Sequence, residues 1–409
     1  MIELADVLAA RERVAETTRH TPLSYSHAVS AQTGAEVHLK LENTQRTGSF
    51  KIRGATNRIG TLSEAQLAGG VVTASAGNHA QGVALAASRL GVDATVVMPE
   101  DAPVSKVTAT RNYGAEVVLH GADYDEAATR AREIETTEGR YYLPAFNDPA
   151  VMAGQGTIGL EVLEDLPGVD TVVLPVGGGG LIAGVATAIK GWAPDTRVIG
   201  VQAAGAAAGV ESFAAGERVT WDSVDTIADG IATRSVGERP FPVITERVDE
   251  MVTVSDDQIA LAITVALERE KTLVEGAGVA GLAALLVGAF EYGDGETIVP
   301  VLCGGNIDLN TLSTVILRGM IATGRYLRIR TVLPDRPGAL EGLISTIAAS
   351  DANVYAIRHD RSSRDVSMNA AELEIDVETR DHDHVETLLE ALEGAGYEVE
   401  RLTPPTADR

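Results

Sequence analysis

Short apolar runs alternate with longer amphipathic segments over the first three-quarters of the chain. The runs are rich in valine and isoleucine, which favours buried strands. They occupy residues 70–75, 94–99, 115–119, 171–176, 197–202 and 297–303. The segments between them have the apolar spacing of helices, most clearly at 78–90, 104–113 and 124–137. This alternation predicts an α/β protein whose parallel sheet is covered by helices on both faces.

The pattern changes near residue 324. Strand patterns follow at 326–332, 353–361, 368–377 and 397–402, and helical patterns end near residue 350 and cover 381–394. The order βαββαβ predicts a ferredoxin-like unit. We therefore expect a first domain over residues 1–322 and a second over residues 325–409.

Composition narrows the possible partners. The 409 residues include 58 acids and 33 basic residues, and the net charge is −25. Such a surface repels phosphate backbones and anionic lipids, so we expect no nucleic-acid or membrane partner. The first residues lack the basic and apolar regions of a signal peptide. The single cysteine, Cys303, fits a reducing compartment, so we expect a cytoplasmic protein.

Ligands of parallel sheets bind at the carboxyl ends of strands, so the residues there carry the chemical signal. Lys51, one of only five lysines, sits in a Gly/Ser turn before a helix. Lysine forms Schiff bases with carbonyl compounds, although an isolated lysine is more often a surface residue. The turn Ser75–His79 exposes N–H groups at a helix start, which suits a carboxylate or phosphate; an ordinary capped turn is the alternative.

Four consecutive glycines, residues 177–180, follow another strand. Glycine is costly to order, so such a loop indicates close approach of the backbone to a phosphate. Gly178, Gly180 and Ala183 also satisfy a dinucleotide fingerprint, but Gln202 stands where a ribose-binding acid would be expected.

Two further segments have competing interpretations. Cys303 ends a buried strand, where a lone thiol often only packs in the core. Asp381-His382-Asp383-His384 suggests metal ligands, but it more simply opens a helix with Asp381 as its cap.

Taken together, SFKIRG, SAGNHAQG, VGGGGL and LCGGNID, in this order, resemble the fold-type-II pyridoxal-phosphate enzymes. The resemblance is greatest to the threonine ammonia-lyases and covers residues 1 to about 320. It implies two open twisted sheets covered by helices, with the smaller subdomain over roughly residues 46–150. Residues 325–409, with the motif DRPGAL, resemble an ACT domain, an amino-acid-sensing module.

The resemblance also implies a set of site residues. Lys51 would be the catalytic residue and carry the cofactor as a Schiff base, with Phe50 beside it. The other expected cofactor contacts are Asn78 at the 3′-oxygen, Cys303 at the ring nitrogen, and Gly177, Gly178, Gly179, Gly180 and Leu181 at the phosphate. The substrate carboxylate would be held by Ser75, Ala76, Gly77, Asn78 and His79. Asn147 and Gly230 would line the pocket, and Glu275 would lie near the ring or serve only as a helix-start acid.

The implied activity is dehydration and deamination of L-threonine to 2-oxobutanoate and ammonia, with L-serine as a second substrate. The ACT module implies a homo-oligomer, a dimer or tetramer, under control by a branched-chain amino acid such as isoleucine, whose biosynthesis would use the product. Serine dehydratase, serine racemase, threonine synthase, an NAD enzyme and a non-catalytic amino-acid sensor remain alternatives. Serine racemases have a second serine where Ala76 stands, and metal carboxylates where Gln202 and Ala208 stand, so we expect no metal site.

The charge pattern generates a prediction about salt. Acids outnumber basic residues and lysine is rare, which resembles proteins of a salt-rich, halophilic cytoplasm. Salt shortens the screening length from about 10 Å at 0.1 M to about 3 Å at 1 M, which weakens self-repulsion. We expect the melting temperature measured by calorimetry at pH 7 to rise with KCl. The rise should shrink near the isoelectric point of about 4.7, and a flat response at pH 7 would contradict the halophile interpretation.

Overall fold

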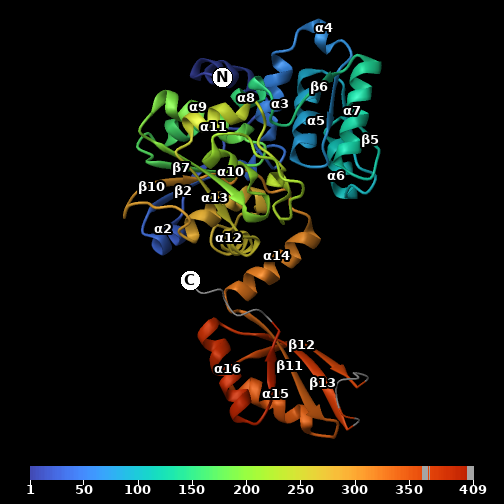
Figure 1. The fold of residues 1–409 in the computed structure, drawn as a ribbon, viewed down its shortest axis with the longest axis vertical. Helices are drawn as coiled ribbons and strands as arrows, with labels where there is room; N and C mark the ends of the chain where they lie inside the picture. Colours follow the sequence, from blue (N-terminus) through green and yellow to red (C-terminus); the bar gives the residue numbers. More distant parts are fainter. Residues whose placement is uncertain (362–366, 368, 403–409) are drawn as a thin grey trace. The chain divides into compact units, whose positions relative to one another are not determined.

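The computed structural model describes residues 1–361, 367 and 369–402 (Figure 1). The chain divides into two compact units, Met1–Asp308 and Leu309–Arg409. Helix α14 (Leu309–Ala322) therefore groups with the second unit, whereas the sequence pattern suggested that the first domain continues to residue 322. Among the described residues, no helix combines the length and the apolar character needed to cross a membrane.

The larger sheet of the first unit has six strands. In spatial order they are β1 (Leu23–Tyr25), β2 (Glu36–Lys40), β10 (Thr297–Pro300), β7 (Thr171–Pro175), β8 (Arg197–Ala203) and β9 (Glu250–Val254). All neighbours are parallel except β1 and β2. The parallel core confirms the prediction; β1, β2 and β9 are strands that the apolar pattern did not reveal.

Helices cover both faces of this sheet. They are α1 (Leu4–Val14), α2 (His27–Thr33), α8 (Pro149–Asp165), α9 (Gly180–Trp192), α10 (Ala208–Ala215), α11 (Pro240–Arg247), α12 (Asp256–Glu268) and α13 (Gly276–Leu286), with 3₁₀ turns η1 (Glu42–Thr44), η2 (Ala204–Ala206) and η3 (Asp229–Ile231). Val172 and Leu174 of β7 join the core built with α9. Val173, between them, meets α13 at Gly281. Alternate side chains of one strand thus face α9 and α13, as a sheet buried on both sides requires.

The smaller sheet is parallel throughout, in the order β5 (Glu116–Leu119), β4 (Ala94–Met98), β3 (Val71–Ala74) and β6 (Tyr141–Tyr142). Its helices are α3 (Lys51–Gly60), α4 (Glu64–Leu67), α5 (Asn78–Leu90), α6 (Val104–Asn112) and α7 (Tyr124–Glu138). One core joins the sheet to α3, α5 and α6. A second core joins the other face to α7, so this sheet too lies between helices.

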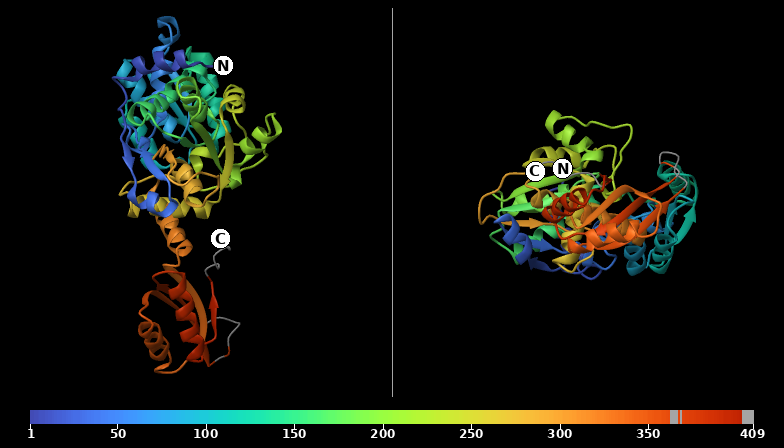
Figure 2. Two further views of the ribbon diagram at one scale, coloured as in Figure 1. Left: turned by 90° about the vertical axis from the view of Figure 1, so that its left-hand side faces the viewer. Right: turned by 90° about the horizontal axis from the view of Figure 1, so that it is seen from below.

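The second unit has the predicted βαββαβ order after α14: β11 (Tyr326–Pro334), α15 (Ala339–Ala349), β12 (Asn353–Asp360), β13 (Ala370–Glu378), α16 (His382–Gly394) and β14 (Val399–Arg401). The antiparallel sheet runs β12-β13-β11-β14, a ferredoxin-like arrangement. Both helices pack on one face of it in a single core (Figure 2). Residue 368, where the sequence pattern began a strand, lies outside the described residues.

Candidate active site

The candidate site residues of three sequence motifs lie at the carboxyl ends of strands from both sheets, as the α/β pattern predicts. The loop beginning at Ser75 follows β3 of the smaller sheet. The glycine loop follows β7, and Cys303 follows β10, both in the larger sheet. The site residues therefore come from the two halves of the first unit.

Segment 47–50 is fastened to segment 303–306, which brings Lys51 next to the end of β10. Ser49 and Gly304 form an antiparallel bridge. The Phe50 N–H donates to the Cys303 carbonyl at 3.1 Å, and the Gly305 N–H donates to the Gly48 carbonyl at 2.9 Å. These bonds fix the start of helix α3, and with it Lys51, against the larger sheet.

The Lys51 amine lies in a setting that favours its neutral form. Nζ donates to the Ala145 carbonyl at 3.1 Å and lies 5.1 Å from the centre of the Phe50 ring. Loss of hydration lowers the pKa of Lys51 to about 8, although Cys303 and Glu275 act in the opposite direction. Among the described residues no carboxylate forms an ion pair with it. An amine of this kind is suited to attack a carbonyl carbon.

Buried ion pairs, which no motif in the sequence indicates, hold helix α3 in place. Arg53 Nη2 lies 2.7 Å from Glu42, its Nη1 lies 2.6 Å from Glu161, and Lys40 Nζ lies 2.7 Å from Glu161. Burial acts to raise the pKa of Glu161, but Arg53 and Lys40 outweigh it and keep the carboxylate charged. The cluster ties α3 to α8, η1 and β2.

The loop before α5 borders an open space at Gly77. The Gly77 N–H donates to Ser75 Oγ at 3.1 Å, and a Cβ placed on Gly77 would meet no atom within 4 Å. Ser75, Ala76, Gly77 and Asn78 are all partly exposed. Helix α5 is 13 residues long, so its positive end favours an anion here.

His79 differs from its neighbours because its side chain is buried. Nε2 donates to the Leu143 carbonyl at 3.1 Å. Burial, together with the charge of Lys51, lowers the pKa of His79 to about 3, so the ring stays neutral. The imidazole therefore packs beneath the loop, and the backbone N–H is the part of His79 that the loop can offer to a ligand.

The glycine loop has the features of an anion cradle. Residues 177–180 are buried and open the 13-residue helix α9, and Gly179 has a φ of +88°, which favours glycine. In the described part of the chain, the N–H groups of Gly177, Gly178 and Gly179 donate to no protein acceptor. Unpartnered N–H groups at a helix start are donors for a phosphate.

Packing is a second reason for these glycines. A Cβ on Gly178 would lie 2.4 Å from the Phe146 ring, and one on Gly180 would lie 2.9 Å from Phe146 Cβ. Phe146 follows Ala145, whose carbonyl holds Lys51, and precedes Asn147, whose Oδ1 accepts from the Arg239 N–H at 2.9 Å. The segment 145–147 thus connects the lysine to the glycine loop, a link that the sequence alone did not show.

Cys303 is buried beside Lys51. Its thiol donates to the Ala277 carbonyl, with Sγ 3.7 Å from the oxygen. Burial, reinforced by the charge of Glu275, raises the pKa of Cys303, so it stays protonated. This group is a weak hydrogen-bond donor rather than a nucleophile.

Glu275 and Asn306 complete the site. Glu275 precedes α13 but makes no side-chain capping bond; it accepts from Asn78 Nδ2 at 2.5 Å. Burial raises the pKa of Glu275, against the hydrogen bond from Asn78. Asn306 Nδ2 donates to Asn78 Oδ1 at 2.7 Å. The motif around Cys303 contains Asn306, but nothing in its spacing shows that the side chain reaches Asn78.

The histidines near residue 382 have structural roles in the second unit. Asp381 Oδ1 accepts from the His384 N–H at 2.8 Å, which confirms Asp381 as the cap of α16. His382 and His384 each bond a backbone carbonyl, of Ala322 and Ser350. In the described part of the chain no group of three or more potential ligands could hold a metal ion.

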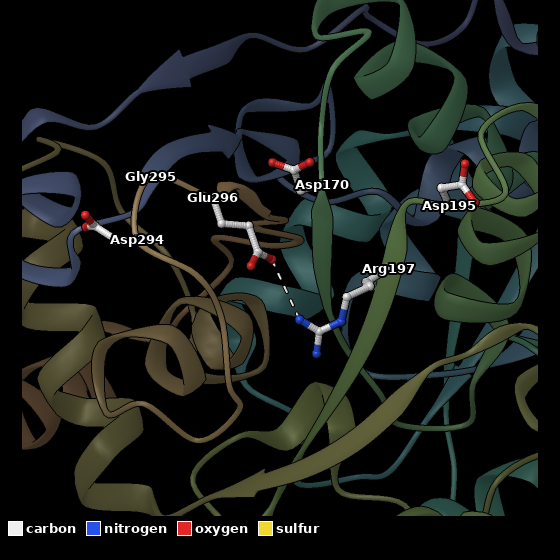
Figure 3. A pocket seen from close by; sticks show the side chains of 6 residues that line it. All are labelled: Asp170, Asp195, Arg197, Asp294, Gly295 and Glu296. Carbon is white, nitrogen blue, oxygen red and sulfur yellow. Dashed lines mark ion pairs between the residues drawn. The ribbon is translucent and has the colours of Figure 1, made fainter.

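A surface hollow of about 440 Å³ lies elsewhere, at the amino ends of β7, β8 and β10 (Figure 3). It is lined by Asp170, Asp195, Arg197, Asp294, Gly295 and Glu296. Glu296 pairs with Arg197 at 3.7 Å. Because the predicted site residues lie at the carboxyl ends of the strands, this hollow is not part of the candidate site.

Comparisons with known proteins identify the family of the chain. A family model described as "Pyridoxal-phosphate dependent enzyme" matches residues 14–304, and the chain belongs to this family, whose cofactor is pyridoxal phosphate. The L-threonine ammonia-lyase of Geobacter sulfurreducens is 48% identical over 402 residues, which are 98% of this chain and 100% of that protein. The catabolic L-threonine dehydratase TdcB of Escherichia coli is 45% identical over 315 residues, 77% of this chain and 96% of that protein.

A solved structure is also similar to the first unit's fold. The processed form of threonine deaminase isoform 2 from Solanum lycopersicum superimposes with a TM-score of 0.74 at 43% identity. The match covers 76% of this chain and 86% of that chain. The fold thus agrees with the resemblance inferred from sequence.

Proposed function

We propose that this chain catalyses the pyridoxal-phosphate-dependent deamination of L-threonine to 2-oxobutanoate and ammonia. The observation that carries the proposal is the buried Lys51 amine, whose pKa is lowered to about 8 and which donates to the Ala145 carbonyl, next to the Phe146 ring that packs on the glycine loop. The threonine ammonia-lyase that matches 98% of the chain supports the choice of substrate.

The residues present fit the cofactor. Lys51 offers an amine of lowered pKa to an aldehyde. The N–H groups of residues 177–179, which have no acceptor among the described residues, suit a phosphate, and Gly180 and Leu181 at the start of α9 would join them. Phe50, Asn78 and Cys303 are the remaining contacts in this proposal. When bound, pyridoxal phosphate withdraws electrons from the substrate, which acidifies its Cα–H and lets the β-hydroxyl leave as water.

The residues of the chain would have separate roles in the reaction. The turn Ser75–His79 would hold the substrate carboxylate at the positive end of α5 and so fix Cα toward Lys51. Because the Ser75 and Gly77 N–H groups already donate to the Val97 carbonyl and to Ser75 Oγ, the donors would be the N–H groups of Ala76, Asn78 and His79. Lys51 Nζ would then be the general base that takes the Cα proton. At the ring nitrogen the protonated Cys303 thiol would be only a weak hydrogen-bond donor, which would make the cofactor a weaker electron sink and favour prompt loss of the β-hydroxyl. Water is lost in elimination and regained in the hydrolysis that releases ammonia.

Ala76 distinguishes this proposal from a serine racemase. Racemisation needs a second group on the opposite side of Cα to return the proton, and a methyl group cannot do so. Serine would therefore be dehydrated to pyruvate rather than inverted, and L-serine is the expected second substrate.

The direct test is Lys51→Ala assayed for 2-oxobutanoate release from L-threonine. We expect turnover to fall by about 10³-fold or more, because one truncation removes both the cofactor attachment and the base. Lys190→Ala, at the far end of α9, is the matched control and should retain activity. A wild-type protein that releases no 2-oxobutanoate from threonine, or a fully active Lys51→Ala variant, would overturn the proposal.

The lowered pKa of Lys51 gives a pH prediction. Only the neutral amine attacks an aldehyde, so the rate at which cofactor-free protein takes up pyridoxal phosphate should rise about tenfold per pH unit below pH 8. Above pH 8 the rate should level off, measured from the visible absorption of the bound cofactor. With an unburied lysine peptide the rise should continue toward pH 10.4. The same continued rise in the protein would contradict a buried Lys51.

We further propose that the second unit is an ACT domain that controls the first, and that the chain acts as a homo-oligomer. The ferredoxin-like unit has its own core, and none of the candidate site residues lies in it. Gly338 opens the 11-residue helix α15 after the turn at 335–338, where backbone N–H groups could take an amino-acid carboxylate. An isoleucine effector would place the reaction in isoleucine biosynthesis.

The corresponding prediction is a change in threonine response. Isoleucine or valine should shift the half-saturating threonine concentration of the full chain by roughly 5–150-fold, the usual size of allosteric coupling. A chain ending at residue 308 should stay active and lose the shift; the Escherichia coli dehydratase, 96% covered by 315 aligned residues, suggests that a protein of about this length suffices. A full chain indifferent to both amino acids would leave the second unit with an assembly role alone.

A further inference from the structure

The Asn78 side chain is held at both ends of its amide. Its Oδ1 accepts from Asn306 Nδ2 at 2.7 Å, and its Nδ2 donates to Glu275 Oε1 at 2.5 Å. Asn306 Nδ2 also donates to the Thr47 carbonyl at 2.7 Å. The four groups form one continuous relay, from the strand-like segment before Lys51 to the start of α13.

The relay permits only one orientation of the Asn78 amide. The Thr47 carbonyl can only accept, so the NH₂ end of Asn306 must face it. The second hydrogen of that NH₂ group then meets Asn78 Oδ1, which turns the NH₂ end of Asn78 toward the Glu275 carboxylate. Reversing either amide would set two acceptors or two donors against each other, at the cost of buried hydrogen bonds.

The backbone around the relay leaves just enough room for it. A Cβ on Gly48 would lie 2.4 Å from Asn306 Oδ1, and a Cβ on Gly304 would lie 2.3 Å from Glu275 Oε1. Both glycines belong to the paired segments that carry Lys51 and Cys303. The room for the relay is therefore built into the same backbone that positions the lysine.

Helix capping does not account for Glu275. It is the residue before α13, yet its carboxylate makes no side-chain bond to the helix's first turn. Its carboxylate instead accepts from the Asn78 side chain, and the backbone N–H of Asn306 acts to lower its pKa. Both donors come from the site, not from α13.

We propose that Glu275 and Asn306 are positioning residues that lock the Asn78 amide, leaving one Nδ2 hydrogen for the 3′-oxygen of pyridoxal phosphate. This inference rests on the proposed role of Asn78 in the site. Glu275 and Asn306 act through Asn78 and need no contact with the cofactor. Asn78 has two Nδ2 hydrogens, and Glu275 uses one of them.

A double-mutant cycle tests the proposal by a measurement other than turnover. The dissociation constant of pyridoxal phosphate and the visible spectrum of the bound cofactor are measured for wild type, Asn78→Ala, Glu275→Gln and the double variant. A glutamine has one accepting oxygen and one NH₂ group, so it cannot serve both donors without opposing one of them. We expect Glu275→Gln to weaken cofactor binding about tenfold and to shift the spectrum.

In the Asn78→Ala background the same Glu275→Gln change should alter the dissociation constant by less than about twofold, since the group it positions is gone. Asn306→Ala provides a second route: it removes the donor to Asn78 without touching α13 and should show the same dependence. Glu3→Gln is the matched control, because Glu3 also directly precedes a helix, α1, but is exposed. Its cofactor affinity should equal that of the wild type.

The outcomes distinguish the role of Asn78 in cofactor binding from the positioning role of Glu275 and Asn306. If Asn78→Ala weakens cofactor binding but the effects of Glu275→Gln and Asn306→Ala simply add to it, the positioning role is wrong and the role of Asn78 stands. If Asn78→Ala leaves both the affinity and the spectrum unchanged, the role of Asn78 is wrong and the positioning role falls with it. Threonine turnover by the wild type tests the proposed function independently of either result.

Discussion

The buried ion cluster that joins helix α3 to α8 is the constraint on which the arrangement of the site depends. Arg53, Lys40 and Glu42 are fully buried, and Glu161 nearly so. Removing one member of such a cluster leaves an uncompensated buried charge, which typically costs about 3–5 kcal/mol. Arg53 lies two residues after Lys51, so this requirement fixes the first turn of α3 on α8. The helix that carries the amine cannot shift without separating buried charges.

A second constraint is the pairing of segment 47–50 with segment 303–306. It holds Lys51, at the start of α3, next to the segment that contains Cys303. Burial at this junction explains three properties together: Lys51 is more easily neutral, Cys303 stays a thiol, and His79 stays uncharged. Loss of water disfavours every charged form, and among the described residues no carboxylate forms an ion pair with the lysine.

The proposed relay follows from the same paired backbone. Thr47 and Asn306 lie on the two paired segments, Glu275 lies at the start of α13, and Asn78 opens α5 of the smaller sheet. The amide orientation of Asn78 thus depends on residues far apart in the chain. Glycines 48 and 304 have no chemistry of their own, yet a methyl group at either position would collide with the relay.

The sequence by itself determined the class of fold and the motifs that end the strands, because both are local. Apolar period, turn residues and the glycine run depend on neighbouring residues, and α5 begins and ends at the residues predicted, Asn78 and Leu90. Short or less apolar strands such as β1, β6 and β9 were not predicted, because sheet pairing, not propensity, makes them strands. Only the tertiary structure decided that Arg53 is a buried anchor, that Phe146 fills the glycine loop, and that Glu275 and Asn306 meet at Asn78. Those contacts join residues up to 228 positions apart, such as Asn78 and Asn306, and no periodicity along the chain encodes them.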